Sequence, residues 1–180
     1  MDIFHEQLVK RHRSARQWLI KALALVGLGF IAVISLIFLM GLFPMNMIPA
    51  AGLVWLAWYV SGTQDVEYEY ILTNDDLDID KIIAKRKRKR LITTKVSKFT
   101  DFGIYTDEKS DMSGLTLIKC TGISYPDENG EIPASVTYFA DFPHNALGNC
   151  RLLFSPNPDL LEQMSKALPR ALRISKPKND

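Results

Sequence analysis

Six consecutive cations from position 85 to position 90 are the strongest chemical signal in the sequence. Anionic lipid headgroups attract such residues when the residues lie next to a membrane. A solvated turn between two strands would carry the same charges, and the sorting of loops across a membrane also favours them. Nucleic acid is not an expected partner, because the run contains no aromatic side chain on which a base could stack. The candidate headgroup contacts are therefore Lys85, Arg86, Lys87, Arg88, Lys89 and Arg90.

Just before this run, four side chains at alternate positions resemble the start of a calcium loop: Asn74, Asp76, Asp78 and Asp80. Such a loop needs a glycine for its sharp turn and a glutamate as its last ligand. Ile79 and Lys85 stand at these two positions. We therefore expect no metal site, and interpret the acidic residues as the outer face of a strand beside the basic run.

No catalytic or cofactor-binding motif is complete. His144, close to Asp141, would need a nucleophile to act as a general base, and the sequence identifies none. The text GLGFIA at residues 27–32 matches a dinucleotide fingerprint, but no strand precedes it. We expect a protein that is not an enzyme, with no catalytic residue, metal or cofactor. The alternative is a membrane-associated enzyme acting on a lipid or envelope substrate, which would show a cleft with titratable groups around His144 and Asp141.

The elements that position these residues begin with two apolar segments. The 180 residues include 22 Lys plus Arg and 20 Asp plus Glu, yet the 43 residues 22–64 contain neither these nor histidine. A helix over residues 22–43 would reach about 33 Å, enough to cross the hydrocarbon of a bilayer. A second over residues 45–62 would reach about 27 Å, so whether it fully spans stays open. Pro44, Asn46 and Pro49 predict a tight reversal between them.

Basic residues predict the orientation. Residues 1–21 form a basic segment with five Lys or Arg against two acidic residues, and such flanks stay in the cytoplasm. We expect a multi-pass protein of the cell membrane with both termini cytoplasmic. Side chains near one membrane face would anchor it at headgroup level: Trp18, Lys21, Trp55, Trp58 and Tyr59. The alternative is a single span followed by a re-entrant helix, which would place everything after Gly62 outside and allow Cys120 and Cys150 to form a disulfide; otherwise we expect two buried free thiols.

Residues 65–174 change to the period-two pattern of half-buried strands. Further apolar runs after residues 66–73 predict six or seven short strands. Asn157 and Pro158 then predict a helix over residues 158–168, and residues 175–180 form a tail. The expected architecture is a membrane α-helical hairpin plus an α+β soluble domain, a small antiparallel β-barrel or sandwich closed by the C-terminal helix.

The basic N-terminus, the two apolar runs, EYEYILTNDDLDIDKIIAKRKRKR and the closing LFSPNPDLLEQMSKALPR together resemble a family of small two-span membrane proteins of low-GC Gram-positive bacteria, a domain of unknown function. The soluble part resembles a bacterial pleckstrin-homology-like (PH-like) domain. This resemblance implies location and architecture and no chemistry. The expected function is a non-enzymatic integral membrane protein that presents a cytosolic PH-like domain at the inner membrane surface, for a protein partner or anionic lipid. Oligomerisation is left open.

Overall fold

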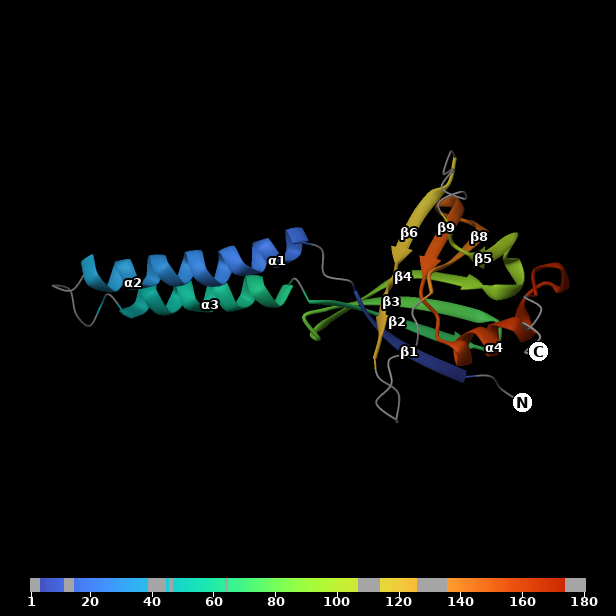
Figure 1. The fold of residues 1–180 in the computed structure, drawn as a ribbon, viewed down its shortest axis with the longest axis horizontal. Helices are drawn as coiled ribbons and strands as arrows, with labels where there is room; N and C mark the ends of the chain where they lie inside the picture. Colours follow the sequence, from blue (N-terminus) through green and yellow to red (C-terminus); the bar gives the residue numbers. More distant parts are fainter. Residues whose placement is uncertain are drawn as a thin grey trace. The chain divides into compact units, whose positions relative to one another are not determined.

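The computed structural model describes residues 4–11, 15–38, 45, 47–63, 65–106, 114–125 and 136–173. These residues form two β-sheets and several helices (Figure 1). The chain divides into two compact units. The β unit contains Met1–His12, Glu67–Ile82 and Arg88–Asp180, and the helical unit contains Arg13–Val66 and Ile83–Lys87.

The elements, in chain order, are β1 (Phe4–Arg11), α1 (Ala15–Ala22), α2 (Leu28–Phe38), α3 (Met47–Thr63), β2 (Val66–Thr73), β3 (Asp76–Ile83), β4 (Lys87–Lys95), β5 (Asp101–Ile104), β6 (Thr116–Cys120), β7 (Gly122–Ser124), β8 (Tyr138–His144), β9 (Gly148–Phe154) and α4 (Pro158–Ala167). The first sheet has the strand order β4-β3-β2-β1-β7, and the second has the order β5-β8-β9-β6. The expectation of a mostly β domain with a terminal helix is confirmed. The expectation of a purely antiparallel arrangement is wrong, because β6 pairs with β9 in parallel from Thr116↔Cys150 onward.

Strand β1 is the largest difference from the sequence-based expectation, which places residues 1–21 in a segment ahead of the membrane. Phe4–Arg11 instead pairs antiparallel with β2, from Phe4↔Thr73 to Lys10↔Glu67, and its other edge pairs with β7. The Val9 side chain is completely buried. The β domain is therefore not built from residues 65–174 alone, since one of its inner strands precedes the helical segment.

Apolar side chains from both sheets and α4 make one core in the β unit. Its largest fully buried side chains include Tyr70, Leu72, Leu77 and Ile79 of the first sheet and Phe139, Phe142, Leu152 and Phe154 of the second. The Tyr70 and Phe154 rings meet edge to face at 5.8 Å. In α4, Leu160 and Met164 are fully buried, and the Asn157 side chain accepts a hydrogen bond from the Leu160 amide at 2.8 Å. The helix cap predicted from the sequence is confirmed.

The helical unit is a pair of apolar helical segments. Helix α1 continues through a π-helical turn at Leu23–Gly27 into α2, and both pack against α3 (Figure 1). Small side chains fill the seam between the segments: Ala24, Ala32, Ala50, Ala57 and Ser61 are buried. Such residues let helix backbones approach closely, which is the usual packing of helices inside membranes.

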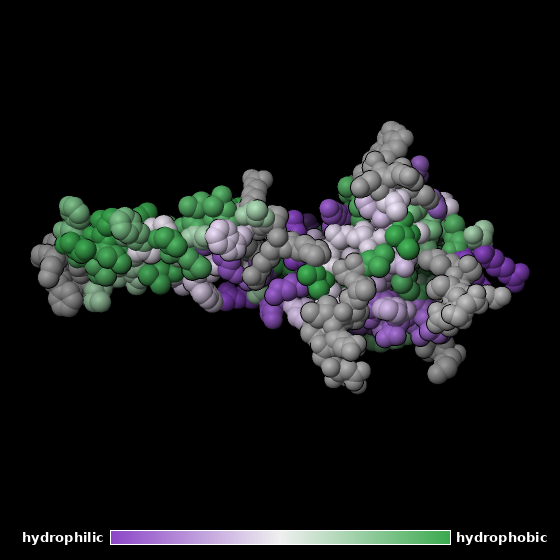
Figure 2. Space-filling model, in the orientation of Figure 1, coloured by the Kyte–Doolittle hydropathy of each residue, from purple (hydrophilic) through white to green (hydrophobic). Residues whose placement is uncertain are grey.

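One helix among the described residues is long and apolar enough to cross a membrane by length and composition: Trp18–Phe38, with 21 residues. It begins before the expected span of residues 22–43, and residues 39–44 lie outside the described part. Helix α3 is apolar but shorter, at 17 residues, close to the expected residues 45–62. Only 11% of the most apolar stretch of Trp18–Phe38 is buried. Figure 2 shows hydrophobic surface along the visible face of these helices.

Candidate membrane-interface site

Four of the five predicted anchors make defined contacts within the helical unit, near the end where α1 begins and α3 finishes. The Lys21 ammonium lies 3.2 Å from the Asp65 carboxylate, so it links α1 to the residues that follow α3. The Trp55 and Tyr59 rings stack on each other at 5.6 Å. The Arg86 guanidinium lies over the Trp58 ring, 4.4 Å from the ring centroid. Trp18, the fifth, is 66% exposed.

The turn between β3 and β4 belongs to the helical unit and brings part of the basic run to this end. The Ala84 amide donates to the Asp65 carbonyl at 2.8 Å, and the Arg86 amide donates to the Ile83 carbonyl at 3.1 Å. Ala84 and Lys85, the two central residues, both have a φ of 54°. These values belong to the primed hairpin turns, which usually need glycine or asparagine at such positions. The side chains of Lys85, Arg86 and Lys87 are exposed.

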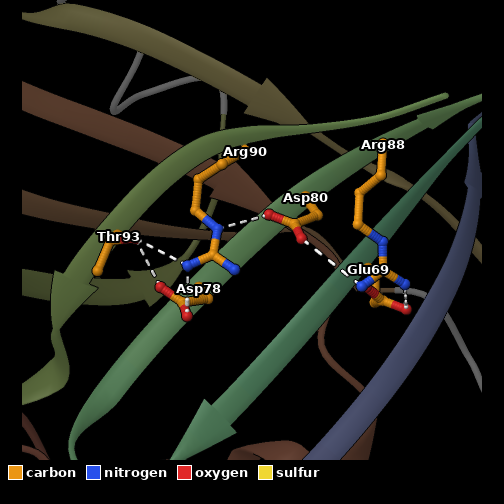
Figure 3. A network of polar contacts seen from close by, with 6 residues as sticks. All are labelled: Glu69, Asp78, Asp80, Arg88, Arg90 and Thr93. Atoms are coloured by element: carbon orange, nitrogen blue, oxygen red, sulfur yellow. Dashed lines mark hydrogen bonds and ion pairs between the residues drawn. The ribbon is translucent and has the colours of Figure 1, made fainter.

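The next part of the basic run has different partners. Arg88 bonds the buried Glu69 carboxylate at 2.7 Å and lies 3.9 Å from Asp80 (Figure 3). Arg90 bonds Asp80 and Asp78, each at 2.7 Å. The six cations therefore do not form one surface. Two of them neutralise acidic side chains of β2 and β3, as the interpretation of the acidic residues as a strand's outer face predicts.

The same network explains the residues that resemble a calcium loop. Asp78 also accepts a hydrogen bond from the Thr93 hydroxyl at 2.6 Å (Figure 3), and Asp76 pairs with Lys95 at 2.9 Å. Asn74 occupies the β2–β3 turn with a φ of 55°. Within the described ranges, no group of three or more His, Cys, Asp or Glu residues is placed to hold a metal ion.

Glu69 is the most unusual ionisable group of this network. Its side chain is 3% exposed, and its Oε2 atom has no hydrogen-bond partner among the described residues. Burial raises the pKa of the Glu69 carboxyl, and the neighbouring Glu6 carboxyl raises it further, although the charge of Arg88 acts in the opposite direction. The pKa of Arg90 is raised mainly by its hydrogen bond to Asp80. The network therefore links the strands β2, β3 and β4 through their side chains.

A pocket of about 260 Å³ includes one residue of the pair that the enzyme alternative needs, Asp141. The pocket is lined by Thr100, Leu115, Asp141, Phe142, Pro143 and Asn149. Asp141 is its one titratable lining residue, and Arg151 holds it with two hydrogen bonds of 2.7 and 2.6 Å. His144 is not in the lining, and its Nδ1 atom accepts a hydrogen bond from the Ala146 amide at 3.3 Å. The pocket therefore contains one of the two residues that the enzyme alternative needs.

A buried polar cluster around Gln7 was not predicted from the sequence. The Gln7 amide nitrogen donates to the Ser124 hydroxyl at 2.9 Å and to the Ser155 carbonyl at 3.1 Å. Its carbonyl oxygen accepts from the Asn157 amide at 2.9 Å. Gln7 thus ties β1 to the residues that cap α4. The alternation of Gln7 and Val9 was the available signal for a buried strand. Glutamine is mostly an exposed residue, so its presence on the inner face did not indicate a core position.

The sequence comparison identifies one family. The chain matches the family described as "Bacterial PH-like domain (DUF6106)" over residues 1–174. No curated protein and no solved structure matches the chain. The predicted resemblance of the soluble part to a bacterial PH-like domain is confirmed.

Proposed function

The chain belongs to this family of bacterial PH-like domains, and from this premise we propose that it is a non-enzymatic membrane protein. In this proposal two membrane-spanning helices hold the β unit at the inner membrane surface. The β unit then serves as a docking module for a protein partner or for anionic lipid. The proposal has three supports: strand pairing, exposed apolar surface and flanking charge.

The observation that carries the proposal is the pairing of β1 with β2. These strands flank the helical segment in the sequence, yet they are hydrogen-bonded neighbours from Phe4↔Thr73 to Lys10↔Glu67. Two strands of one sheet must lie on the same side of a membrane, because unpaired strand edges are not tolerated in hydrocarbon. The chain must therefore cross an even number of times between Arg11 and Val66. This favours two crossings over a single span with everything after Gly62 outside.

The exposed apolar surface supports a lipid environment for this segment. A long apolar helix in a water-soluble core would be mostly buried, whereas 11% of the most apolar stretch of Trp18–Phe38 is buried. Large apolar side chains such as Phe30, Val33 and Ile37 are more than half exposed. A surface of this extent is strongly unfavourable in water. At 17 residues, α3 reaches about 26 Å, so it crosses if it stands upright or the bilayer thins.

The flanking charges support the inner surface as the location. Basic residues precede α1, and the β3–β4 turn is also basic, whereas residues 44–49 contain no Lys or Arg. This distribution is that of two helices whose free ends and attached domain stay in the cytoplasm.

The experiment replaces residues 12–65 with the dipeptide Asn-Gly. The last pair of the β1–β2 register is Lys10↔Glu67, so the next two residues to face each other are Arg11 and Val66. Asn-Gly suits a two-residue hairpin turn between them. We expect the full chain to stay in membranes through an alkaline carbonate wash, and the shortened chain to fold in water without detergent. A control chain that begins at Val66 lacks β1 and should not fold. Release of the full chain into water by the wash would contradict the proposal.

A further inference from the structure

The cations of the basic run differ in whether an acidic side chain of the protein already pairs with them. Arg88 and Arg90 are ion-paired with carboxylates of the β unit. Among the described residues, no carboxylate lies within ion-pairing distance of Lys85, Arg86 or Lys87. The turn bonds the backbone carbonyl of Asp65, and the carboxylate of Asp65 is already ion-paired with Lys21. The turn therefore carries a local excess of three positive charges.

Arg86 is held in a way that leaves its donors available. Its guanidinium carbon lies over the Trp58 ring, 4.4 Å from the ring centroid. This cation–π contact uses the charge of the group and none of its N–H donors as hydrogen bonds. No described residue accepts a hydrogen bond from this guanidinium. A planar fork of free donors matches the oxygen atoms of a phosphate.

The turn is also fixed in place. The Ala84 amide bonds the Asp65 carbonyl just after α3, and the left-handed backbone of Ala84 and Lys85 places the basic side chains at the tip of the hairpin. A non-glycine residue in this conformation is strained, and such strain often marks a functional site. Arg86 contacts the Trp58 ring. If Trp58 lies at headgroup level, as tryptophan prefers, the Arg86 guanidinium lies at that level as well.

We infer that Lys85, Arg86 and Lys87, with Arg86 positioned by Trp58, form a binding site for the phosphate of an anionic phospholipid. This inference rests on the proposed function, because it requires that the helical unit be in a bilayer. It differs from a general attraction of all six cations, since Arg88 and Arg90 belong to the β-sheet network and take no part. Lys89 is exposed on β4, outside the helical unit, and is not a member of the site.

The test measures lipid binding to the purified full chain in detergent by native mass spectrometry, with phosphatidylglycerol and phosphatidylcholine as the probes. A variant with Lys85→Gln, Arg86→Gln and Lys87→Gln removes the site. A matched control with Lys98→Gln, Lys119→Gln and Lys166→Gln removes the same charge from exposed positions of the β unit. A juxtamembrane cation strengthens binding to an anionic surface by about fivefold, so the site variant should bind phosphatidylglycerol between about 5-fold and 100-fold more weakly. Its binding of phosphatidylcholine should not change.

Three results would overturn the phospholipid site, and a fourth would overturn the role of Trp58 in it. No specific site exists if the wild-type chain binds the two lipids equally. The same conclusion follows if the control variant loses as much affinity as the site variant. Competition by soluble glycerol phosphate at the affinity of the lipid shows a site for free phosphate instead. Trp58→Leu should reproduce the effect of Arg86→Gln if the ring positions Arg86, and wild-type binding by Trp58→Leu excludes that role. In every case the carbonate wash reports separately whether the proposed membrane location stands.

Discussion

The substitution Gln7→Leu tests whether β1 is an integral part of the β domain. Gln7 precedes the helical segment, whereas its three partners, Ser124, Ser155 and Asn157, follow that segment and lie more than a hundred residues after Gln7. Leucine has a similar volume but cannot make these hydrogen bonds. Each net hydrogen bond contributes about 1 kcal/mol, so the free energy of unfolding should fall by about 3 kcal/mol. With a urea dependence of about 1.5 kcal/mol per molar, the midpoint should drop by roughly 2 M.

The assay uses the two cysteines of the chain, Cys120 and Cys150, which are both buried in the β unit. Their reaction with a thiol reagent in increasing urea, on the full chain in detergent, reports unfolding of the β unit and not of the helices. Gln163→Leu is the matched control, because the Gln163 side chain bonds only the exposed Lys166 in the described structure. It should shift the midpoint by less than about 0.5 M. A Gln7→Leu midpoint equal to that of the control would refute the placement of β1.

Three further results are expected. First, the raised pKa of Glu69 means that the folded state holds this proton more tightly than the unfolded state, so the contribution of Glu69 is most favourable below the unfolded value of 4.5 and is lost as the pH rises through the folded value. Urea midpoints should therefore fall more between pH 5 and pH 8 in the wild type than in Glu69→Gln, and parallel curves would contradict the shift. Second, burial raises the pKa of Cys120 to about 12, so labelling of this thiol in the native protein at pH 8 should be at least about 100-fold slower than in urea; equal rates would exclude its burial. Third, a Cβ at Gly122 would overlap the Lys10 carbonyl; Gly122→Ala should destabilise the β unit by about 2 kcal/mol or more, and an unchanged urea midpoint would contradict the close pairing of β7 with β1.

The sequence could predict the elements whose pattern is local. The alternation in residues 66–73 predicts β2, and Asn157 with Pro158 predicts the start of α4. Both signals depend only on residues a few positions apart. The apolar segments were equally clear, because their lack of charge extends over many residues.

The features that the sequence could not predict depend on contacts between distant residues. Strand β1 pairs with a strand about sixty residues later, and its inner face includes the polar Gln7. The sequence pattern of this segment therefore indicated a basic flank and not a strand. The division of the basic run depends on the register that places Arg88 beside Glu69 and Arg90 beside Asp80. A run of six like charges carries no information about which of them have partners. The strand pairing therefore reduces the candidate headgroup site from the six cations predicted from the sequence to three.

The location of three points of the chain relative to the membrane tests the central proposal most directly. Alkaline phosphatase, active only outside, and a green fluorescent protein, fluorescent only inside, would be fused in turn at the N-terminus, at Met45 and after Asp180. We predict fluorescence at both ends of the chain and phosphatase activity only at Met45, because β1 and β2 must share one side. Phosphatase activity after Asp180 together with fluorescence at the N-terminus would place the two strands on opposite sides and contradict the account.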